Sequence, residues 1–151
     1  MEVASAAALW DWLAAHHGRD EGVLPMTWTA AHRDRYVSRE AVLGALIAHG
    51  WIDGRRYNLD ADRTMQLITP RRQQAWAQSY KARADRLEAE GRMHPAARAA
   101  VETGRRSSLW DVMAHVDALD VSDDLADRLT AVGGATWFAA AAPSYRRNVL
   151  R

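Results

Sequence analysis

The run of residues 50–56 (Gly-Trp-Ile-Asp-Gly-Arg-Arg) places an aromatic ring, a carboxylate and two guanidinium groups within one short segment. A second cluster follows at residues 69–72 (Thr-Pro-Arg-Arg), with Trp76 close behind it. Paired arginines bind a carboxylate or phosphate through parallel hydrogen bonds, and an aromatic ring offers a stacking surface. We therefore expect a cleft lined by arginine and tryptophan that binds a small anionic or aromatic ligand.

The residues expected to line this cleft come from predicted strands and the segments that flank them: Trp28, Trp51, Arg55, Arg56, Tyr57, Arg71, Arg72 and Trp76. Strand alternation predicts that one face of the first hairpin strand carries Trp51, Asp53, Arg55 and Tyr57. A purely structural role fits the same segment, in which Asp53 pairs with an arginine and Gly54 marks a β-bulge.

Acid–base chemistry is the alternative use of this segment. Asp53 is the candidate general acid or base, with His49 or Tyr80 as its partner, and the arginines would stabilise a developing anion. The histidines lack the spacing of a metal-binding pair, so we expect no metal site. No nucleophile elbow, phosphate-binding glycine loop or dinucleotide fingerprint is present, so any enzyme is expected to work without a cofactor.

Charge is distributed unevenly along the chain. Residues 54–86 hold eight basic and three acidic side chains, a net charge of +5, whereas the whole chain carries +1. Residues 111–127 hold six acids and no Lys or Arg. This pattern predicts either an anion-attracting cleft or an ordinary solvated helix face. No nucleic-acid-binding signature occurs, so no specific nucleic-acid partner is expected.

The elements that must position these residues follow from periodicity and capping signals. Helices are predicted at residues 5–17, 38–50, 72–90 and 95–104, with Ser5 and Ser38 as N-caps. Strands are predicted at residues 23–31, 52–59 and 64–69, the last two joined by a turn at residues 60–62. The expected fold class is α+β, a small antiparallel sheet packed with several helices.

The C-terminal part is predicted to be helical, broken at Gly133-Gly134. At 151 residues the chain is most simply one domain, with an α/β body at about residues 1–104 and a helical tail at about 105–151. There is no cysteine, no apolar run long enough to span a bilayer and no signal-peptide pattern at the N-terminus. We therefore expect a cytoplasmic protein without a transmembrane segment; the sequence leaves its oligomeric state open.

Several motifs resemble those of the YdeI/OmpD-associated family, also called bacteriocin-protection proteins, over about residues 8–105. They are Trp12-Leu13 with His16-His17, Glu40-Ala41-Val42, Gly50-Trp51-Ile52-Asp53-Gly54, Leu59-Asp60 with Arg63, Thr69-Pro70-Arg71-Arg72 with Trp76, and Glu90-Gly91-Arg92-Met93 with Pro95-Ala96. The resemblance implies an α+β fold and a role in envelope stress or tolerance of antimicrobial peptides. Departures at residues 23–28, Ile68 and Tyr80 indicate a specialised member with altered ligand preference.

Three functions remain open from the sequence. The first is a protein that binds a small molecule or peptide antibiotic and so provides protection, in stress or in self-resistance within a biosynthetic pathway. The second is a cofactor-independent cyclase, isomerase or hydrolase that acts on a natural product, with Asp53 as acid or base. The third is an interaction module that docks on a partner through the acidic tail or through Trp137-Phe138.

Overall fold

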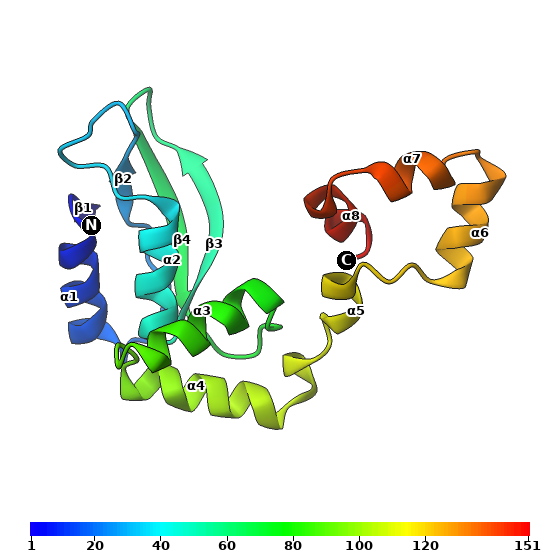
Figure 1. Cartoon of the computed structure of the whole chain (residues 1–151). Helices are drawn as coiled ribbons and strands as arrows, with labels where there is room; N and C mark the ends of the chain where they lie inside the picture. Colours follow the sequence, from blue (N-terminus) through cyan, green and yellow to red (C-terminus); the bar gives the residue numbers. More distant parts are fainter.

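A computed structural model describes residues 1–151 and shows the predicted α+β fold (Figure 1). The sheet consists of β1 (Glu2–Val3), β2 (Met26–Trp28), β3 (Trp51–Asn58) and β4 (Arg63–Pro70). Its strand order is β1-β2-β4-β3, with β2 and β3 both antiparallel to β4. The short β1 pairs in parallel with β2, which makes the sheet mixed rather than wholly antiparallel.

The helices of the body are α1 (Ala6–His16), α2 (Arg39–Ala48), α3 (Gln78–Ala89) and α4 (Pro95–Arg106). A 3-10 turn, η1 (Ser108–Trp110), leads into α5 (Ala114–Ala118), α6 (Asp123–Ala131), α7 (Ala135–Ala140) and α8 (Pro143–Val149). The two predicted serine caps are confirmed, since the Ser5 and Ser38 hydroxyls accept hydrogen bonds from Ala8 N and Ala41 N at 3.1 and 3.2 Å. None of the helices has the length and apolar character needed to cross a membrane.

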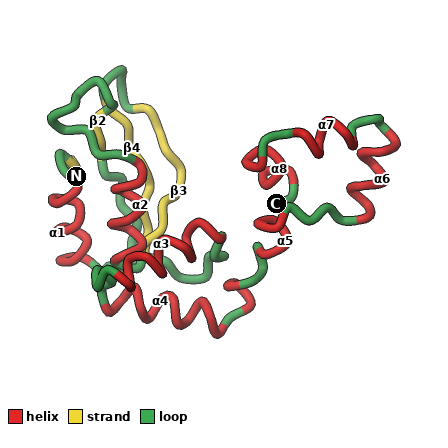
Figure 2. Tube along the Cα trace, in the orientation of Figure 1, coloured by secondary structure: helices red, strands yellow, loops and turns green.

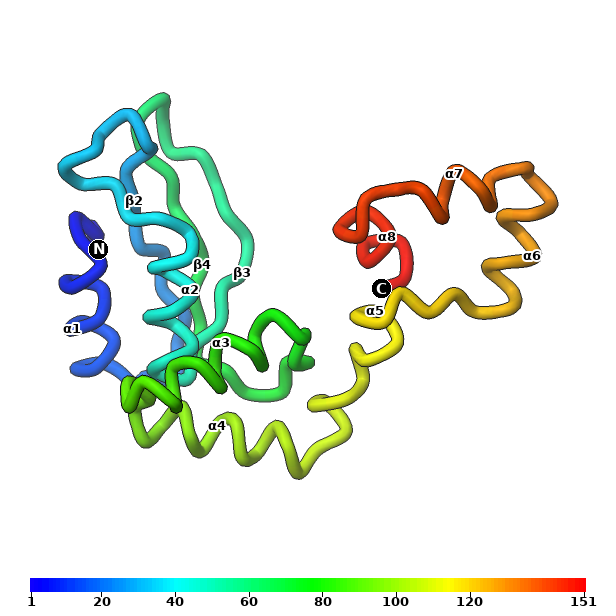
Figure 3. Tube along the Cα trace, viewed as in Figure 1, coloured from blue at the N-terminus to red at the C-terminus, as the bar shows by residue number.

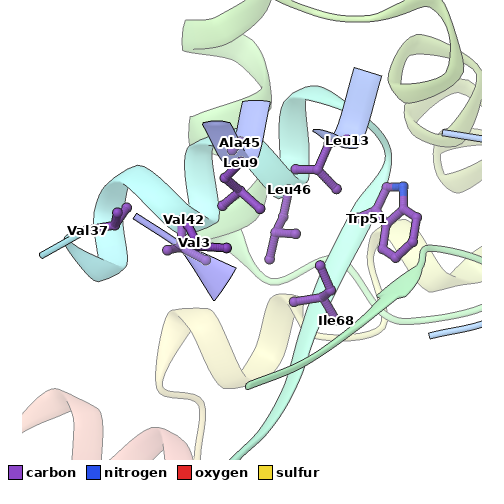
Figure 4. Close-up of a cluster of buried hydrophobic side chains, with 9 residues drawn as sticks. All are labelled: Val3, Leu9, Leu13, Val37, Val42, Ala45, Leu46, Trp51 and Ile68. Carbon is purple, nitrogen blue, oxygen red and sulfur yellow. The ribbon is translucent and has the colours of Figure 1, made fainter. Parts of the chain in front are cut away.

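Helices α1 and α2 lie side by side against the sheet, and α3 and α4 close the lower end of the body (Figure 2). The main hydrophobic core lies between the sheet and these first two helices (Figure 4) and consists of Val3, Leu9, Leu13, Val37, Val42, Ala45, Leu46, Trp51 and Ile68. A second cluster joins α2, α3 and α4 through Ile47, Ala48, Trp76, Ala84, Leu87, Met93 and Ala97.

A bulge in β3 changes which side chains share a face. Asp53 is opposite Ile68, but the register then shifts so that Arg56 is opposite Gln66. Residues directly opposite each other in a sheet point to the same side, so Arg56 joins Asp53 on the helix-covered face. The predicted alternation, which grouped Arg55 and Tyr57 with Asp53, is therefore wrong beyond the bulge.

Two predicted elements are shorter in the structure. The strand expected at residues 23–31 is reduced to β2, with Val23 forming an isolated bridge to Ile68. The helix expected from residue 72 begins only at Gln78, because the preceding loop is held by other contacts. In that loop the Arg71 side chain donates to Ala75 O at 2.7 Å, and Trp76 N donates to Leu109 O at 3.0 Å.

The helices α5 to α8 form a group beside the body rather than on the sheet (Figure 3). They meet the body at the N-terminus of α3, where the Asp117 carboxylate accepts a hydrogen bond from Gln78 N at 2.8 Å. Lys81 also pairs with Asp111 at 3.4 Å. An acid from the tail thus supplies the N-cap that the α3 sequence itself lacks.

Candidate functional site

A chain of polar contacts runs across the helix-covered face of β3 and β4. The Tyr80 hydroxyl, from the first turn of α3, donates a hydrogen bond to Asp53 Oδ1. The other oxygen, Asp53 Oδ2, accepts from Gln66 Nε2 at 3.2 Å, and Gln66 Oε1 accepts from Arg56 Nη2 at 2.8 Å. The bulge in β3 makes this chain possible because it turns Arg56 toward Gln66.

Protonation of this pair follows from its surroundings. Burial, together with the hydrogen bond to the Asp53 carboxylate and its negative charge, raises the pKa of Tyr80 well above its usual range. The phenol therefore keeps its proton at neutral pH and acts as the donor in the contact.

Arg71 is a half-buried cation beside this pair. Its guanidinium carbon lies 3.8 Å from the centre of the Trp76 ring and 5.3 Å from that of Tyr80. Nη2 bonds to Ala75 O, while Nε and Nη1 are buried without a hydrogen-bond partner. Burial lowers the pKa of Arg71 to about 10, so the group remains charged at neutral pH. Two of its three nitrogens thus carry N–H groups for which the protein supplies no acceptor.

A cleft of about 410 Å³ lies where α2 faces α3, lined by Arg39, Glu40, Leu43, Ser79, Tyr80 and Arg83. Glu40 is held by two cations, with Arg83 Nη2 at 2.6 Å and Arg86 Nη2 at 2.9 Å. These hydrogen bonds lower the pKa of Glu40 to about 2. Arg39 forms no ion pair, so the cleft combines an unpaired cation with the Tyr80 ring.

The tryptophans expected to line the cleft are core residues instead. Trp51 is 1% exposed and packs with Leu13, Leu46 and Ile68 (Figure 4), and Trp76 is 4% exposed in the second cluster. Removing this much aromatic surface from water stabilises the folded protein more than leaving the rings exposed in an open cleft. The structure thus gives Trp51 and Trp76 a packing role, and Trp76 also lies against the Arg71 guanidinium; contact of either ring with a ligand stays a prediction.

Other predicted ligand-binding residues lie in separate places. Trp28, in β2, donates from Nε1 to Glu2 Oε1 in the edge strand β1 at 2.8 Å, and β4 separates this pair from β3. Arg55 lies over the ring of Tyr57 at 5.5 Å, and both are exposed beyond the bulge. Arg72 Nη2 donates to Asp20 O at 2.8 Å. The structure therefore brings Arg56 and Arg71 to Asp53 but not these other side chains.

His49 is separated from the Asp53 pair as well. It ends α2, is 3% exposed, and its Nδ1 is hydrogen-bonded to Ala45 O at 2.8 Å. Its ring packs against Trp10 and His94, with centroids 5.0 and 5.7 Å away. His49 and Asp53 are close in sequence, but their side chains have different partners. His49 ends α2 and packs on Trp10 and His94, whereas Asp53 lies in β3 and contacts Tyr80 and Gln66. No group of three or more His, Asp or Glu side chains has the geometry to hold a metal ion.

Sequence reasoning missed Gln66, Arg39 and Arg83 as members of the site. Gln66 gave a usable signal, since it is a lone amide among apolar neighbours in β4 and is 6% exposed. A buried amide needs partners, and in this case it finds Asp53 and Arg56. Arg39 and Arg83 gave no such signal, because a surface arginine on a helix is common.

The fold and the site define an α+β protein with a polar, arginine-bearing cleft where α2 faces α3. The chain belongs to the family described as a domain of unknown function, DUF8412, whose family model matches residues 1–100. The matched residues hold the whole sheet, α1 to α3 and every residue of the cleft. No curated protein and no solved structure matches the chain.

Proposed function

We propose that this protein binds a small anionic molecule or a peptide antibiotic in the α2–α3 cleft and gives protection by sequestering it. The observation that carries the proposal is Arg71, a half-buried guanidinium that lies beside Tyr80 at the edge of this cleft and has two nitrogens without a hydrogen-bond partner. Burying a charge without hydrogen bonds is costly, and an anionic group that reached Arg71 would relieve that cost.

The charges around the cleft support an anion rather than a cation. Glu40 is already neutralised by Arg83 and Arg86, and Asp53 is hydrogen-bonded by Tyr80 and Gln66. Arg39 and Arg71 remain without an acidic partner within ion-pair distance. A ligand that carries a carboxylate on an aromatic ring would meet Arg39 and the Tyr80 face in the cleft, with the Arg71 guanidinium next to the Tyr80 ring.

The resemblance of the 50–56 and 69–72 motifs to YdeI/OmpD-associated proteins agrees with a protective role, and we propose membership of that wider group. Of the cleft residues, Tyr80 is one of the departures from the motif pattern. A cytoplasmic location would let the protein hold an antibiotic that has entered the cell, or one made there.

Titration with benzoate, followed by tryptophan fluorescence, tests the binding. Because Trp76 stacks on Arg71, we expect a saturable change in the wild-type protein. Arg71→Gln and Arg39→Gln should each weaken binding by about tenfold, the value of one charge-assisted hydrogen bond. The matched control is Arg33→Gln, since Arg33 is exposed and forms no ion pair.

A growth assay tests protection itself. Expression of the wild type should raise tolerance of an antimicrobial peptide, and Arg71→Ala should remove the gain. Unchanged tolerance in Arg71→Ala, together with no saturable response to benzoate, would show the proposal to be wrong.

A second candidate, a cofactor-independent enzyme, is favoured by the Tyr80–Asp53 contact. A carboxylate base beside a protonated phenol is a suitable pair for proton transfer. On any compound that the protein turns over, Asp53→Asn should lower kcat by at least about 100-fold, whereas His49→Gln should leave it unchanged. Full turnover by Asp53→Asn would exclude this function.

A further inference from the structure

A second cavity, of about 570 Å³, lies at the other end of α3 from Tyr80. Its walls come from α1, from the end of α2 and from the turn between α3 and α4. The lining residues that matter here are Trp10, Asp11, His49, Arg92, Met93 and His94. None of them belongs to the α2–α3 cleft, so the cavity requires its own explanation.

His49 presents an unused hydrogen-bond acceptor to this cavity. The side chain is 3% exposed, and its Nδ1 must carry a proton because it donates to Ala45 O. Burial, and to a lesser degree the nearby His94 and His17, lowers the pKa of His49, so the ring is neutral at neutral pH. Its Nε2 therefore has a free lone pair and no partner in the protein.

His94 presents the complementary donor. Its Nδ1 accepts a hydrogen bond from Ala96 N at 3.2 Å and thereby caps α4. In a neutral ring the proton must then be on Nε2. The two imidazoles lie nearly parallel, with centroids 5.7 Å apart and an interplanar angle of 29°. The end of α2 and the start of α4 thus place one acceptor and one donor on neighbouring rings, and the His94 ring also packs on His17, with centroids 4.4 Å apart.

The remaining walls favour a flat and uncharged ligand. Arg92 lies over the Trp10 ring at 4.6 Å and is paired with Glu90 at 3.0 Å. Asp11 on α1 offsets what positive charge is left. Trp10 and Met93 supply apolar surface beside the two histidines.

We propose that this cavity binds a planar molecule with an amide edge, an N–H beside a C=O, as in a cyclic lactam or an aromatic carboxamide. The ligand N–H would donate to His49 Nε2, and its carbonyl would accept from His94 Nε2. The ring or chain that bears the amide would lie against Trp10 and Met93. This site is independent of the α2–α3 cleft and of the function proposed for it.

Calorimetric titration of the full-length protein with uracil tests the proposal, with 1,3-dimethyluracil as the matched compound that lacks the N–H donors. Nicotinamide tests the open-chain carboxamide. We expect saturable binding of uracil or nicotinamide, and binding of 1,3-dimethyluracil at least about tenfold weaker, because His49 Nε2 would be left without a donor.

Two variants place the binding in this cavity. His94→Asn keeps an N-cap for α4 but removes the ring donor, and Ala7→Phe places a large side chain in the cavity from the α1 wall. Both should weaken binding at least about tenfold with unchanged circular dichroism, whereas Arg33→Gln should have no effect. Three results would each overturn the proposal. They are equal binding of uracil and 1,3-dimethyluracil, unaltered binding by both variants, and no saturable binding of either uracil or nicotinamide.

Discussion

Glu40 lies where α2 meets α3, and its carboxylate accepts hydrogen bonds from both Arg83 and Arg86. These bonds lower its pKa from 4.5 to about 2. A carboxyl group whose pKa is depressed on folding stabilises the protein above its unfolded pKa, and that contribution is lost as the pH falls through the folded value. The window for Glu40 is therefore from pH 4.5 down to about 2.

We predict that Glu40→Gln lowers stability at pH 7 by less than about 1 kcal/mol, because the pair is half exposed and screened by solvent. The variant should also lose less stability than the wild type between pH 4.5 and pH 2. Urea unfolding at several pH values measures both effects. Glu21→Gln is the control, since Glu21 is exposed and unpaired; equal pH profiles for Glu40→Gln and the wild type would contradict the assignment.

Among the elements, α4 is held against the loop before α3 by one close approach. Gly104 lies directly on the Trp76 indole, and a Cβ at this position would overlap Trp76 Nε1. Trp76 is itself fixed by burial and by the Arg71 guanidinium on its face. The glycine is thus required for packing, although it weakens the helix that contains it.

We predict that Gly104→Ala destabilises the protein by about 1–3 kcal/mol, because the indole must shift within a packed cluster. Gly44→Ala is the matched control, since Gly44 also lies inside a helix but a Cβ added there would meet no atom within 4 Å. That control should stabilise by about 0.5–1 kcal/mol from helix propensity alone. Thermal unfolding of the two variants checks the difference in sign; the same sign for both would refute the packing argument.

Capping and turn residues in the sequence correctly predicted where two helices begin and where the hairpin turns. Ser5 and Ser38 cap their helices, and Asp60 closes the β3–β4 turn through its contacts with the Asp62 and Arg63 backbone amides. The α+β class follows from these elements and is confirmed. What the sequence did not show depends on distant partners, as when Asp117 rather than a local residue caps α3.

The candidate site was predicted only in part, because it too depends on contacts between residues far apart in the sequence. Arg56, Asp53 and Tyr80 are in one network, and the bulge that joins them lies at Gly54, where the sequence indicated one; which side chains it brings together depends on the β3–β4 register. Trp51 and Trp76 were assigned to the ligand because aromatic residues serve stacking and packing equally well in a sequence. Only burial distinguishes the two uses.

At the scale of the whole molecule, the tail is joined to the body through α3, the same helix that presents Tyr80. Trp110 packs on Trp76 with ring centroids 5.2 Å apart, and Asp117 caps the first turn of α3. In the rest of the tail Val116 and Phe138 are buried, whereas Trp137 is 61% exposed. We propose that body and tail form a single domain because of this joint, and that the exposed Trp137 is available to a partner.

Substitution of Asp117 tests whether the attachment of the tail affects ligand binding at the α2–α3 cleft. Asp117→Ala removes the N-cap of α3, a loss of about 1 kcal/mol at the helix end, and frees the tail from the body. We predict faster proteolysis between residues 111 and 122 and weaker benzoate binding, because the first turn of α3 that carries Tyr80 becomes less ordered. The control is Asp120→Ala, whose side chain is exposed and forms no hydrogen bond. The opposite outcome is that both variants are cleaved at the wild-type rate and unfold in one transition with the wild-type midpoint. In that case the Asp117 cap does not hold the tail to the body, and the Trp76–Trp110 contact attaches it instead.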